Sequence, residues 1–551
     1  MVEVATGIAR ILKTEGIEWV STFPVCRVNN ALGQEKIPMI MMRDDRYAVA
    51  LADAYSRMTA GNKIGVCTVQ GGVNAAGLQV AYAGLAQAFE DGSPVLCITD
   101  GVPIGGSENS QFDVTTSLKS VSKWYGYIDH PNRVPEFMRR AFTMLRNGIK
   151  GPVVIAVPNP SAEYDENLDP YEPAKSYKFG PDPLDVQKAL DMINESKKPL
   201  IYAGEGVIYA DASKDLLTFA ESTNIPVATT LKAKGVFPEN HPLSVGVRGD
   251  HTAKFIEESD LILAIGTSLS PGRFSHSIPN ATKKKIIQCN LNELHVNRIF
   301  PTAHCVLGDA KFTLRALIDV NPNSTQKDSN SIRNQIDTER KKDTSKYRPA
   351  MESSETPINP YRVYADMMKV LDPNNSFVTH DSGNTRDQLS TIYETHIPRG
   401  FLGWGNVSTL GFSLPAAMAA KLAYPERDCI AVSGEAGIGY MLGNLEVPVR
   451  EKIGITVVHI SNGGFSGYGP GFWGEGHDPY THTVLGYNEI DMSKMIGEIG
   501  IHTERVSDPS EIVSALNRAL DANKKGIPSY VEFICSQYPV YGGWISGSHG
   551  E

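Results

Sequence analysis

Short apolar runs alternate with longer, helix-like stretches along most of the chain. In the first part of the chain these runs lie at 19–24, 37–42, 64–69, 95–99 and 153–157. The pattern continues at 200–203, 227–230, 261–265 and 286–289, and then at 377–379, 429–433, 455–460 and 530–534. Buried runs that alternate with amphipathic helices are typical of βαβ units around a parallel sheet. The pattern therefore predicts an α/β protein with three doubly wound parallel-sheet domains in series.

Two polar stretches divide the chain into these three parts. Residues 158–183 are rich in Pro, acidic residues and Tyr, and residues 321–360 show almost no apolar periodicity. Both stretches have the composition of linkers. We therefore expect domains at 1–165, 185–325 and 355–545. Ligands of doubly wound sheets bind beyond the carboxyl ends of the strands, so the residues that follow each run are the candidates for chemistry.

Composition and charge exclude several classes of protein. Hydrophobic residues make up 41% and charged residues 21% of the chain, which excludes a disordered or collagen-like protein. The net charge of −10 gives no reason to expect a nucleic acid or an anionic membrane as partner. The seven cysteines include no CxxC pair, which argues against a disulfide framework or a zinc knuckle. The N-terminus is amphipathic and no apolar run reaches about 18 residues, so a cytoplasmic protein is expected.

The most informative segment is 431–437, a buried run that leads into glycines and one carboxylate, Glu435. The next predicted strand ends in Ser-Asn-Gly-Gly-Phe at 461–465. Because neighbouring parallel strands end side by side, Glu435, the amide oxygen of Asn462 and a backbone carbonyl near Gly464 can form an all-oxygen face for Mg²⁺. Taken alone, each half is also typical of an ordinary strand and turn with a solvated Glu or a turn Asn.

Small residues surround the carboxylate of this segment. Gly434, Ala436 and Gly437 would let backbone N–H groups at the start of a helix approach a diphosphate closely.

Together, the two halves resemble the signature of the thiamine diphosphate enzymes, a Gly-Asp-Gly followed at about this distance by an Asn at a strand end. Upstream, 410–417 is similar to the segment in which one bulky apolar side chain, here Leu410, supports the bent cofactor. The resemblance makes the carbonyl of Ser408 the acceptor for the pyrimidine amino group. Segment 381–385 resembles the diphosphate-side loop, which implies phosphate contacts from Asn384 and Thr385. The resemblance also assigns Gly464 and Phe465 to the cofactor site.

The first domain carries the same resemblance. Residues 52–57 are similar to the helix that follows the activating glutamate of the family, and residues 91–94 match its Asp-x-x-Pro turn. The implied domain order is pyrimidine-binding, central and diphosphate-binding, as in acetolactate synthase and its decarboxylase relatives. The family places its cofactor between the first domain of one subunit and the third domain of its partner. The resemblance therefore implies a homo-oligomer, either a dimer or a tetramer.

Two departures from the family pattern concern its acids. Asp45 stands where the family has the glutamate that hydrogen-bonds the pyrimidine ring, and it is one methylene shorter. The alternative interpretation of Asp44 and Asp45 is a helix N-cap with a second acid beside it. Glu435 replaces the Asp of the metal signature and is one methylene longer, whereas Mg²⁺ requires a tight octahedral geometry. Ala436 replaces the last glycine of the signature.

Three further residues are candidates for contact with the substrate. Arg27, in the loop after the first strand, can bind a substrate carboxylate through two hydrogen bonds, although a surface arginine is an equal alternative. Gln70, in the loop after the third predicted strand, can hydrogen-bond a substrate oxygen. His477 lies in the glycine- and aromatic-rich segment 465–482, which can close over a pocket, and it is a candidate proton shuttle.

The central domain has a Gly-x-Gly at 204–206 and a polar, glycine-containing stretch at 266–272, each after a predicted strand. Some relatives bind FAD or ADP in this domain. A lone Gly-x-Gly is weak evidence for either nucleotide.

The leading hypothesis is a thiamine diphosphate- and Mg²⁺-dependent lyase or carboligase that acts on 2-oxo acids, similar to acetolactate synthase. A 2-hydroxyacyl-CoA lyase or oxalyl-CoA decarboxylase is the alternative, because segment 434–446 is similar to that branch. A simple 2-oxo acid decarboxylase is a third. A degenerate, cofactor-binding regulatory subunit is the non-enzymatic hypothesis, because both signature acids are altered.

Overall fold

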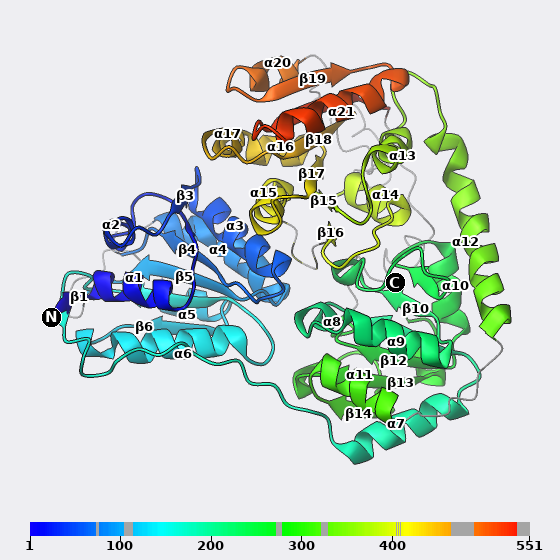
Figure 1. Cartoon of the computed structure of the whole chain (residues 1–551), viewed down its shortest axis with the longest axis horizontal. Coiled ribbons are helices and arrows are strands. Elements are labelled where there is room, and N and C mark those ends of the chain that lie inside the picture. The colour runs from blue at the N-terminus through cyan, green and yellow to red at the C-terminus, as the bar shows by residue number, and fades with distance from the viewer. Residues whose placement is uncertain are drawn as a thin grey trace, which may run out of the picture. The chain divides into compact units, whose positions relative to one another are not determined.

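The computed structural model describes residues 1–72, 76–103, 114–270, 278–320, 329–403, 405, 407, 409–463 and 490–536 (Figure 1). The chain divides into two compact units. The first unit combines residues 1–177 with 406–425 and 441–453, and the second combines 178–405 with 426–440 and the described residues from 454 onward. Two segments of the predicted third domain, 406–425 and 441–453, therefore belong to the unit of the first domain.

The first unit is built on a six-stranded sheet in which every pairing of neighbours is parallel. Its strand order is β3 (Met39–Met41), β2 (Val20–Thr22), β4 (Gly65–Val69), β5 (Val95–Asp100), β7 (Val153–Val157) and β6 (Trp124–Tyr127). The helices are α1 (Val4–Thr14), α2 (Asn29–Gln34), α3 (Asp45–Met58), α4 (Ala76–Glu90), α5 (Val114–Lys119), α6 (Val134–Arg146), α15 (Ser413–Ala423) and α17 (Glu446–Arg450). A short antiparallel pair joins β1 (Val2–Glu3) to β8 (Glu163–Tyr164).

Helices cover both faces of this sheet. Apolar residues of α1 and α6 form one core with alternate residues of the strands, among them Val66, Ile98 and Ile155. Helix α3 packs against β2, β4 and β5 and also contacts α4 and α15. The unit is thus a doubly wound α/β layer structure, in which α3 is the helix that joins the first sheet to the 406–425 segment.

The second unit contains two more parallel six-stranded sheets. The first has the order β11 (Ser244–Gly246), β10 (Val227–Thr229), β9 (Pro199–Ala203), β12 (Leu261–Ile265), β13 (Lys285–Asn290) and β14 (His304–Leu307). The second has the order β16 (Phe401–Leu402), β15 (Ser376–His380), β17 (Asp428–Ser433), β18 (Thr456–Ser461), β20 (Ser529–Ile534) and β19 (His502–Val506). The predicted fold class, three parallel-sheet domains in series, is confirmed.

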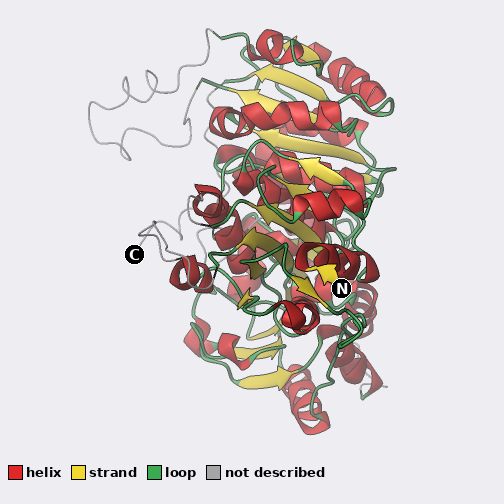
Figure 2. Cartoon of the chain, turned by 90° about the vertical axis from the view of Figure 1, so that its left-hand side faces the viewer, coloured by secondary structure: helices red, strands yellow, loops and turns green. Residues whose placement is uncertain are grey.

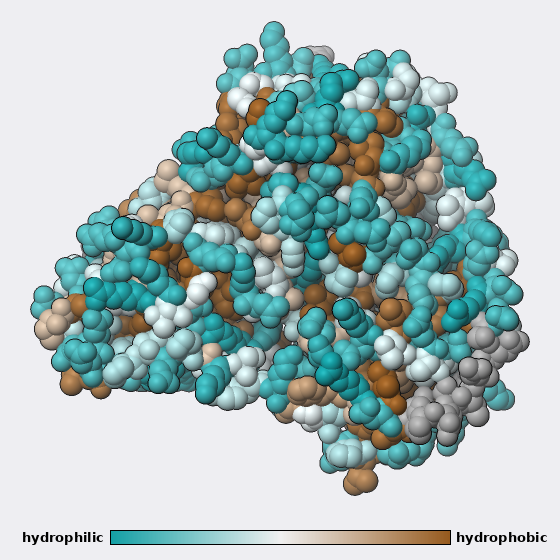
Figure 3. All heavy atoms as spheres, in the orientation of Figure 1, coloured by the Kyte–Doolittle hydropathy of each residue, from teal (hydrophilic) through white to brown (hydrophobic). Residues whose placement is uncertain are grey.

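Helices flank the strands of the second unit as well, and Figure 2 shows them on both sides of the strands. They are α7 (Pro183–Glu195), α8 (Gly206–Tyr209), α9 (Ser213–Thr223), α10 (Asp250–Glu258), α11 (Ala310–Asp319), α12 (Ser329–Met351), α13 (Pro360–Val370), α14 (Asn384–Ile392), α16 (Glu435–Met441), α20 (Met492–Gly497) and α21 (Ile512–Asn523). On the face drawn in Figure 3, hydrophilic residues cover most of the surface and hydrophobic ones form smaller patches.

Every apolar run that we predicted as a strand contains one, and the strands that the pattern missed lie at sheet edges. They are β6, β11, β14, β16 and β19, together with β1 and β8, which form a two-stranded sheet of their own. In β19, four of the five residues are at least partly exposed, and its sequence is His-Thr-Glu-Arg-Val. An edge strand buries less side-chain surface than a central one, so its sequence need not form an apolar run.

The stretch 321–360 is not only a linker, because residues 329–351 form the 23-residue helix α12. This helix contacts α10 and the edge strand β11, and Figure 1 shows it beside α10. Polar contacts hold it there: His251 Nδ1 and Asp343 Oδ2 are 2.6 Å apart, and Arg340 donates to the carbonyl of Ser244. Apolar periodicity failed to predict α12 because much of its attachment is electrostatic.

Asp343 contributes a buried carboxylate to this attachment. Burial opposes its ionisation, but the hydrogen bond and charge of His251 and the charge of Lys346 hold its pKa below the usual 3.8. A carboxyl whose pKa is lowered by folding stabilises the fold above its ordinary pKa, and this stabilisation is lost as the pH falls through the lowered value.

We predict that Asp343→Ala loosens α12 from α10. Breaking a buried ion pair by removing one partner costs about 3–5 kcal/mol, so amide hydrogen exchange in 329–351 should accelerate strongly. Asp337→Ala is the matched control, because Asp337 pairs with Lys341 on the exposed side of the same helix. Equal exchange rates in the two variants would contradict the attachment through Asp343.

Candidate functional site

Helix α3 begins with two adjacent aspartates that make different contacts. Asp44 is the N-cap: its Oδ1 accepts a hydrogen bond from the backbone N–H of Tyr47 at 2.9 Å, and its Oδ2 accepts from Asn444 Nδ2 at 3.1 Å. Asp45 is the first helical residue, and its Oδ1 accepts from the backbone N–H of Gln70 at 3.0 Å. The capping interpretation thus holds for Asp44. The carboxyl of Asp45 instead contacts the exit of β4, by which we mean the residues that directly follow the carboxyl end of the strand.

The environment of Asp45 makes its ionisation less favourable than in water. Only 4% of the residue is exposed, and this burial raises its pKa above the usual 3.8, with a smaller contribution from the charge of Asp44. Hydrogen bonds from the backbone N–H groups of Gln70 and of Asp45 itself oppose the shift. A desolvated carboxyl of this kind can share a proton with a heterocyclic nitrogen more readily than a solvated one.

The exits of β2 and β5 are joined through one more acid, Asp100. Its Oδ1 accepts hydrogen bonds from the backbone N–H of Arg27 at 3.2 Å and from Arg27 Nε at 3.1 Å. The glycine after β4 packs against the same strand end, since a Cβ atom on Gly71 would lie 2.3 Å from the carbonyl oxygen of Asp100. The structure thus joins Arg27 to Asp100, and Gln70 to Asp45, by separate hydrogen bonds at neighbouring strand exits. The sequence analysis did not single out Asp100, although a polar residue that ends a buried run is the signal that could have found it.

Leu410 belongs to the first unit, where α3 holds its segment. The Leu410 carbonyl accepts a hydrogen bond from Arg46 Nη1 at 3.2 Å, and the backbone N–H of Thr409 donates to Gln87 Oε1 at 3.3 Å. Leu410 itself is half-buried. Helix α3 thus carries Asp45 at its start and supports the segment of Leu410 through the next residue, Arg46.

A fully buried group of charges lies farther along α3. Arg57 Nη2 is 2.6 Å from Asp91 Oδ2, and Arg57 Nε is 3.9 Å from Asp53 Oδ1. Gln87 Nε2 donates to Asp53 Oδ2 at 3.4 Å, and the guanidinium lies 5.5 Å from the ring centroid of Phe412. Burial raises the pKa of Asp53 to about 6, although the charge of Arg57 opposes this. The segments 52–57 and 91–94 therefore contribute buried links between α3, α4 and the 409–412 segment.

In the second unit, the exits of β17 and β18 meet at Glu435. Its Oε1 accepts hydrogen bonds from the backbone N–H groups of Asn462 at 2.5 Å and Gly463 at 2.7 Å. Glu435 is 6% exposed, and burial together with the charge of Glu532 raises its pKa to about 7, although these backbone hydrogen bonds and one from its own N–H oppose the shift. The structure thus brings together the carboxylate and the asparagine that the sequence proposed for one site.

The exit of β15, at Asp381, lies beside the start of α16, the helix that begins with Glu435. A Cβ atom added to Gly437 would lie 2.1 Å from Ser433 Oγ and 2.8 Å from Asp381 Oδ2, so only glycine allows α16 to pass this close. By contrast, no atom of the described part lies within 4 Å of a Cβ placed on Gly434 or Gly383. Backbone is therefore accessible where α14 and α16 begin, as a bound phosphate requires.

The remaining residues proposed for the cofactor lie at these exits or outside the described part of the chain. Ala436 and Asn384 are half-buried, and Thr385 is buried with its hydroxyl donating to the carbonyl of Asp381 at 3.2 Å. The residues outside the described part are Ser408, Gly464, Phe465 and His477.

The donor set fits Mg²⁺ and a diphosphate. Glu435 and the side chain of Asn462 provide oxygen atoms, which are the ligands of this ion, and Mg²⁺ commonly keeps positions for phosphates and water. Among the described residues, no group of three or more His, Cys, Asp or Glu side chains is arranged to hold a metal. A cation here would thus depend on one carboxylate, on amide or backbone oxygens and on the phosphates.

The glycines of the central sheet are explained by packing. Gly204 N–H donates to the carbonyl of Ile265 and Gly206 N–H to that of Gly266, both at 2.9 Å. A Cβ atom on Gly204 would lie 2.4 Å from the carbonyl oxygen of Gly266. Two neighbouring strand exits therefore pack backbone against backbone, which accounts for the Gly-x-Gly without a nucleotide.

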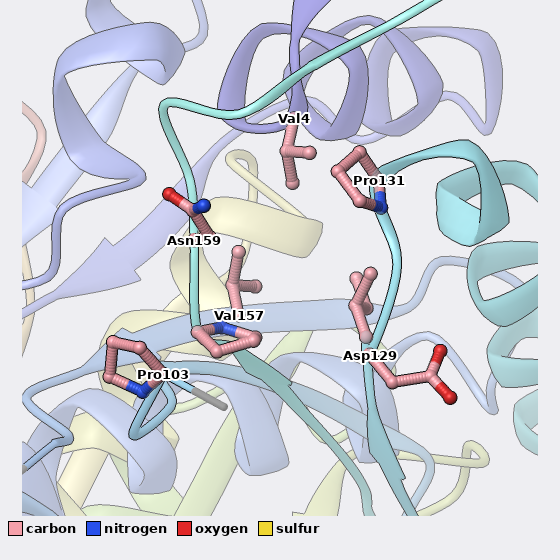
Figure 4. A pocket seen from close by; sticks show the side chains of 8 residues that line it. Val4, Pro103, Asp129, Pro131, Val157 and Asn159 are labelled. Carbon is pink, nitrogen blue, oxygen red and sulfur yellow. The ribbon is translucent and has the colours of Figure 1, made fainter. Parts of the chain in front are cut away.

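A cavity of about 170 Å³ opens at the exits of β5, β6 and β7 (Figure 4). Its lining residues are Val4, Pro103, Ile128, Asp129, Pro131, Val157, Pro158 and Asn159. In Figure 4 the carboxylate of Asp129 points away from Val157 and Asn159. None of the residues proposed from the sequence lines this cavity.

Three parallel-sheet domains in series, with buried acids at the strand exits of the first and third sheets, form an α/β protein of the kind that binds a cofactor at strand exits. Models of the thiamine pyrophosphate enzymes match the chain in order: the N-terminal TPP binding domain at 2–120, the central domain at 186–317 and the C-terminal TPP binding domain at 381–533. Thiamine pyrophosphate and thiamine diphosphate are the same compound.

Relatives match over nearly the whole chain. A probable acetolactate synthase large subunit from Methanocaldococcus jannaschii is 30% identical, over 94% of this chain and 90% of its own length. A glyoxylate carboligase from Escherichia coli O157:H7 is 29% identical, over 82% and 78%. An acetolactate synthase large subunit from Corynebacterium glutamicum is 26% identical, over 91% and 81%. The chain belongs to the thiamine pyrophosphate enzymes, and it is a thiamine diphosphate-dependent enzyme similar to acetolactate synthase.

In the part of the chain that the structure describes, no helix combines the length and the hydrophobicity needed to cross a membrane.

The buried charges of α3 make a prediction about stability. Arg57→Met would leave Asp53 and Asp91 buried without their cation, at a cost of about 3–5 kcal/mol. With about 2–4 °C of melting temperature per kcal/mol, the first unit should melt about 10 °C lower. Arg133→Met is the control, because the ion pairs of Arg133 with Asp129 and Glu136 are exposed and contribute at most about 1 kcal/mol each, and its guanidinium otherwise lies over the ring of Phe137. Similar melting temperatures in both variants would contradict the structural role of Arg57.

Proposed function

We propose that this enzyme is a thiamine diphosphate- and Mg²⁺-dependent carboligase or lyase that acts on small 2-oxo acids. The observation that carries the proposal is the contact of the buried Glu435 carboxylate with the backbone of Asn462 and Gly463. This contact joins the two halves of the cofactor signature at neighbouring strand exits. A buried carboxylate with its pKa near 7 is poorly stabilised as an anion, and a divalent cation would relieve that cost.

In the first unit, Asp45 is proposed as the acid that holds a proton at the pyrimidine ring. The Leu410 side chain would support the bent cofactor, and the Ser408 carbonyl would accept a hydrogen bond from the pyrimidine amino group. When bound, thiamine diphosphate supplies an electron sink next to the substrate carbonyl. The contribution of these residues is orientation and a desolvated, proton-sharing acid.

In the second unit, Glu435, Asn462 and the carbonyl of Gly464 are proposed to hold Mg²⁺. Further residues are proposed to contact the cofactor, through backbone N–H groups at the glycines and Ala436 and through side chains at the others. They are Gly434, Ala436, Gly437, Asn384, Thr385 and Phe465. The backbone at Gly434 is accessible, which supports a diphosphate at this position.

Three residues are proposed to act on the substrate. Arg27 would bind a substrate carboxylate, Gln70 would hydrogen-bond a substrate oxygen and His477 would transfer a proton. The names of the relatives, acetolactate synthase and glyoxylate carboligase, support small 2-oxo acids over acyl-CoA compounds.

We also propose domain limits of 1–165, 185–325 and 355–545, and assembly into a homodimer or homotetramer. The family models at 2–120, 186–317 and 381–533 support the limits, since each lies within one of the three proposed ranges.

The function is tested by assaying the purified chain with thiamine diphosphate and Mg²⁺. Pyruvate and glyoxylate are the substrates of the proposed reaction, and a 2-hydroxyacyl-CoA and oxalyl-CoA represent the alternative. We expect condensation products from a 2-oxo acid, with activity lost after removal of Mg²⁺ by a chelator. If only an acyl-CoA is cleaved, the acyl-CoA lyase or decarboxylase hypothesis is correct instead. If pyruvate releases CO₂ without condensation, the chain is a simple 2-oxo acid decarboxylase. Absence of thiamine diphosphate binding in the presence of Mg²⁺ would overturn it.

Asp45→Asn should lower kcat by about 10²–10⁴-fold, the usual contribution of a positioned acid or base, while cofactor binding persists. The amide keeps the size of the side chain but cannot share a proton in the same way. Asp44→Asn is the matched control: it removes a charge beside the same helix start, and asparagine is an equally good N-cap. An Asp45→Asn variant with the parent kcat would show that this acid is not needed for catalysis.

A further inference from the structure

The central domain contacts helix α14 of the third domain through a buried arginine. Arg248 lies between β11 and α10, and only 3% of it is exposed. Its Nη1 donates to Asp387 Oδ1 at 2.7 Å and to Ser390 Oγ at 2.9 Å. Asp387 and Ser390 are three residues apart and therefore neighbours on one face of a helix. A single nitrogen of Arg248 thus contacts successive turns of α14.

A second guanidinium holds the same carboxylate from within the helix. Arg386 Nε donates to Asp387 Oδ1 at 2.7 Å, and Arg386 Nη2 donates to Asp387 Oδ2 at 3.0 Å. Burial opposes the ionisation of Asp387, but the charges and hydrogen bonds of Arg386 and Arg248 hold its pKa below the usual 3.8. Hydrogen bonds to an ionised acceptor are stronger than those between neutral groups. The link between Arg248 and α14 is therefore a strong one.

The backbone that carries Arg248 is itself fixed. The preceding residue, Val247, belongs to the apolar core of the third domain, together with Tyr364 and Leu389. The carbonyl of Arg248 accepts a hydrogen bond from the hydroxyl of Thr252, in α10, at 3.1 Å. The apolar contact of Leu389 alone would let α14 turn about its own axis. The polar contacts of Arg248 with two side chains of the helix restrict that rotation.

The start of α14 is where the diphosphate is proposed to bind. Asn384 and Thr385 directly precede Arg386, and the Thr385 hydroxyl donates to the carbonyl of Asp381 at 3.2 Å. Gly383, the N-cap, has a φ of 88°, and no atom of the described residues lies within 4 Å of a Cβ placed on it. The backbone is thus accessible at this end, and the orientation of α14 determines where its first N–H groups point.

We propose that Arg248 is a positioning residue for the cofactor. From the central domain it holds α14, and with it the residues at 383–385, in the orientation that the diphosphate requires. This inference rests on the proposed function, because the diphosphate at this position belongs to that proposal. It gives the central domain a part in cofactor binding that does not depend on a nucleotide in its own sheet.

Arg248→Met is the principal variant. Asp387 keeps both hydrogen bonds from Arg386, so the variant should fold while α14 loses its link to the central domain. We expect the Kd of thiamine diphosphate, titrated in the presence of Mg²⁺, to rise about 10- to 100-fold, the usual effect at metal sites when a partner that orients a ligand is removed. We expect kcat at saturating cofactor and KM for the 2-oxo acid to stay within about twofold of the parent, because the lost interaction affects cofactor binding alone.

Lys234→Met is the matched control. Lys234 is a buried cation of the central domain whose Nζ lies 2.6 Å from Glu239 Oε1, and Glu239 Oε2 accepts from the backbone N–H of Thr395, beyond the end of α14. This variant removes a buried charge near the same helix, but not at its start. It should lower the melting temperature and leave the Kd of thiamine diphosphate unchanged. An equal rise of this Kd in both variants would show a general loss of stability and overturn the proposal.

Two further variants test the contact itself. Arg248→Lys keeps the charge without the planar fork, and it should recover part of the affinity that Arg248→Met loses. Ser390→Ala combined with Arg248→Met should weaken cofactor binding no further than Arg248→Met alone, because the effects of residues in contact are not additive. Additive effects of the pair, or no recovery in Arg248→Lys, would overturn the role of this contact.

A readout without cofactor tests the attachment of α14. Amide hydrogen exchange of 384–392 should accelerate several-fold in Arg248→Met and not in Lys234→Met. Unchanged exchange in Arg248→Met would overturn the proposal whether or not the parent is active. Faster exchange with the parent Kd for thiamine diphosphate would overturn the positioning of the cofactor. A parent that binds no thiamine diphosphate would overturn the proposed function, while faster exchange would still support the attachment of α14 through Arg248.

Discussion

The ion pair between Arg57 and Asp91 is the interaction on which the first unit depends most. Both side chains are completely buried, and the guanidinium also faces Asp53 and the ring of Phe412. A buried cation is tolerated only when acceptors surround it, because the loss of hydration must be offset by several polar contacts. These contacts connect α3 with the turn after α4 and with the 409–412 segment. The position of Asp45, at the other end of α3, follows from how firmly this helix is held.

The acid proposed for catalysis and the acid proposed for the metal are both placed by backbone N–H groups at a strand exit. Asp45 accepts from Gln70, which follows β4, and Glu435 accepts from Asn462 and Gly463, which follow β18. In each case burial raises the pKa, and the backbone hydrogen bonds moderate the shift. Parallel sheets expose unpaired N–H groups where their strands end, so this edge can hold a carboxyl group without other charged residues.

The sequence was sufficient for the central strands, because these are buried on both faces and appear as apolar runs. It was insufficient for edge strands such as β19 and for helix α12, whose attachment depends on pairs such as His251 with Asp343. The motifs identified Glu435 and Asn462, and the structure brings them together. Periodicity could not reveal Asp100, since its importance comes from donors that are far away in the sequence. Nor could it separate the cap Asp44 from Asp45, because this depends on which carboxyl faces Tyr47 and which faces Gln70.

The two altered signature acids suggested a degenerate subunit, but their surroundings give a different physical account. A longer side chain at Glu435 reaches the backbone of the next strand exit, and a shorter one at Asp45 reaches the N–H of Gln70. A lost cofactor site would remove the reason to keep a carboxyl group buried, since desolvation makes each of these acids costly to ionise. Both remain almost fully buried, at 4% and 6% exposure, with open backbone beside Gly434. Each buried acid carries a desolvation cost, and a protein without a cofactor site would be stabilised by replacing either acid with a neutral residue. The presence of both acids therefore favours a working cofactor site over a structural remnant.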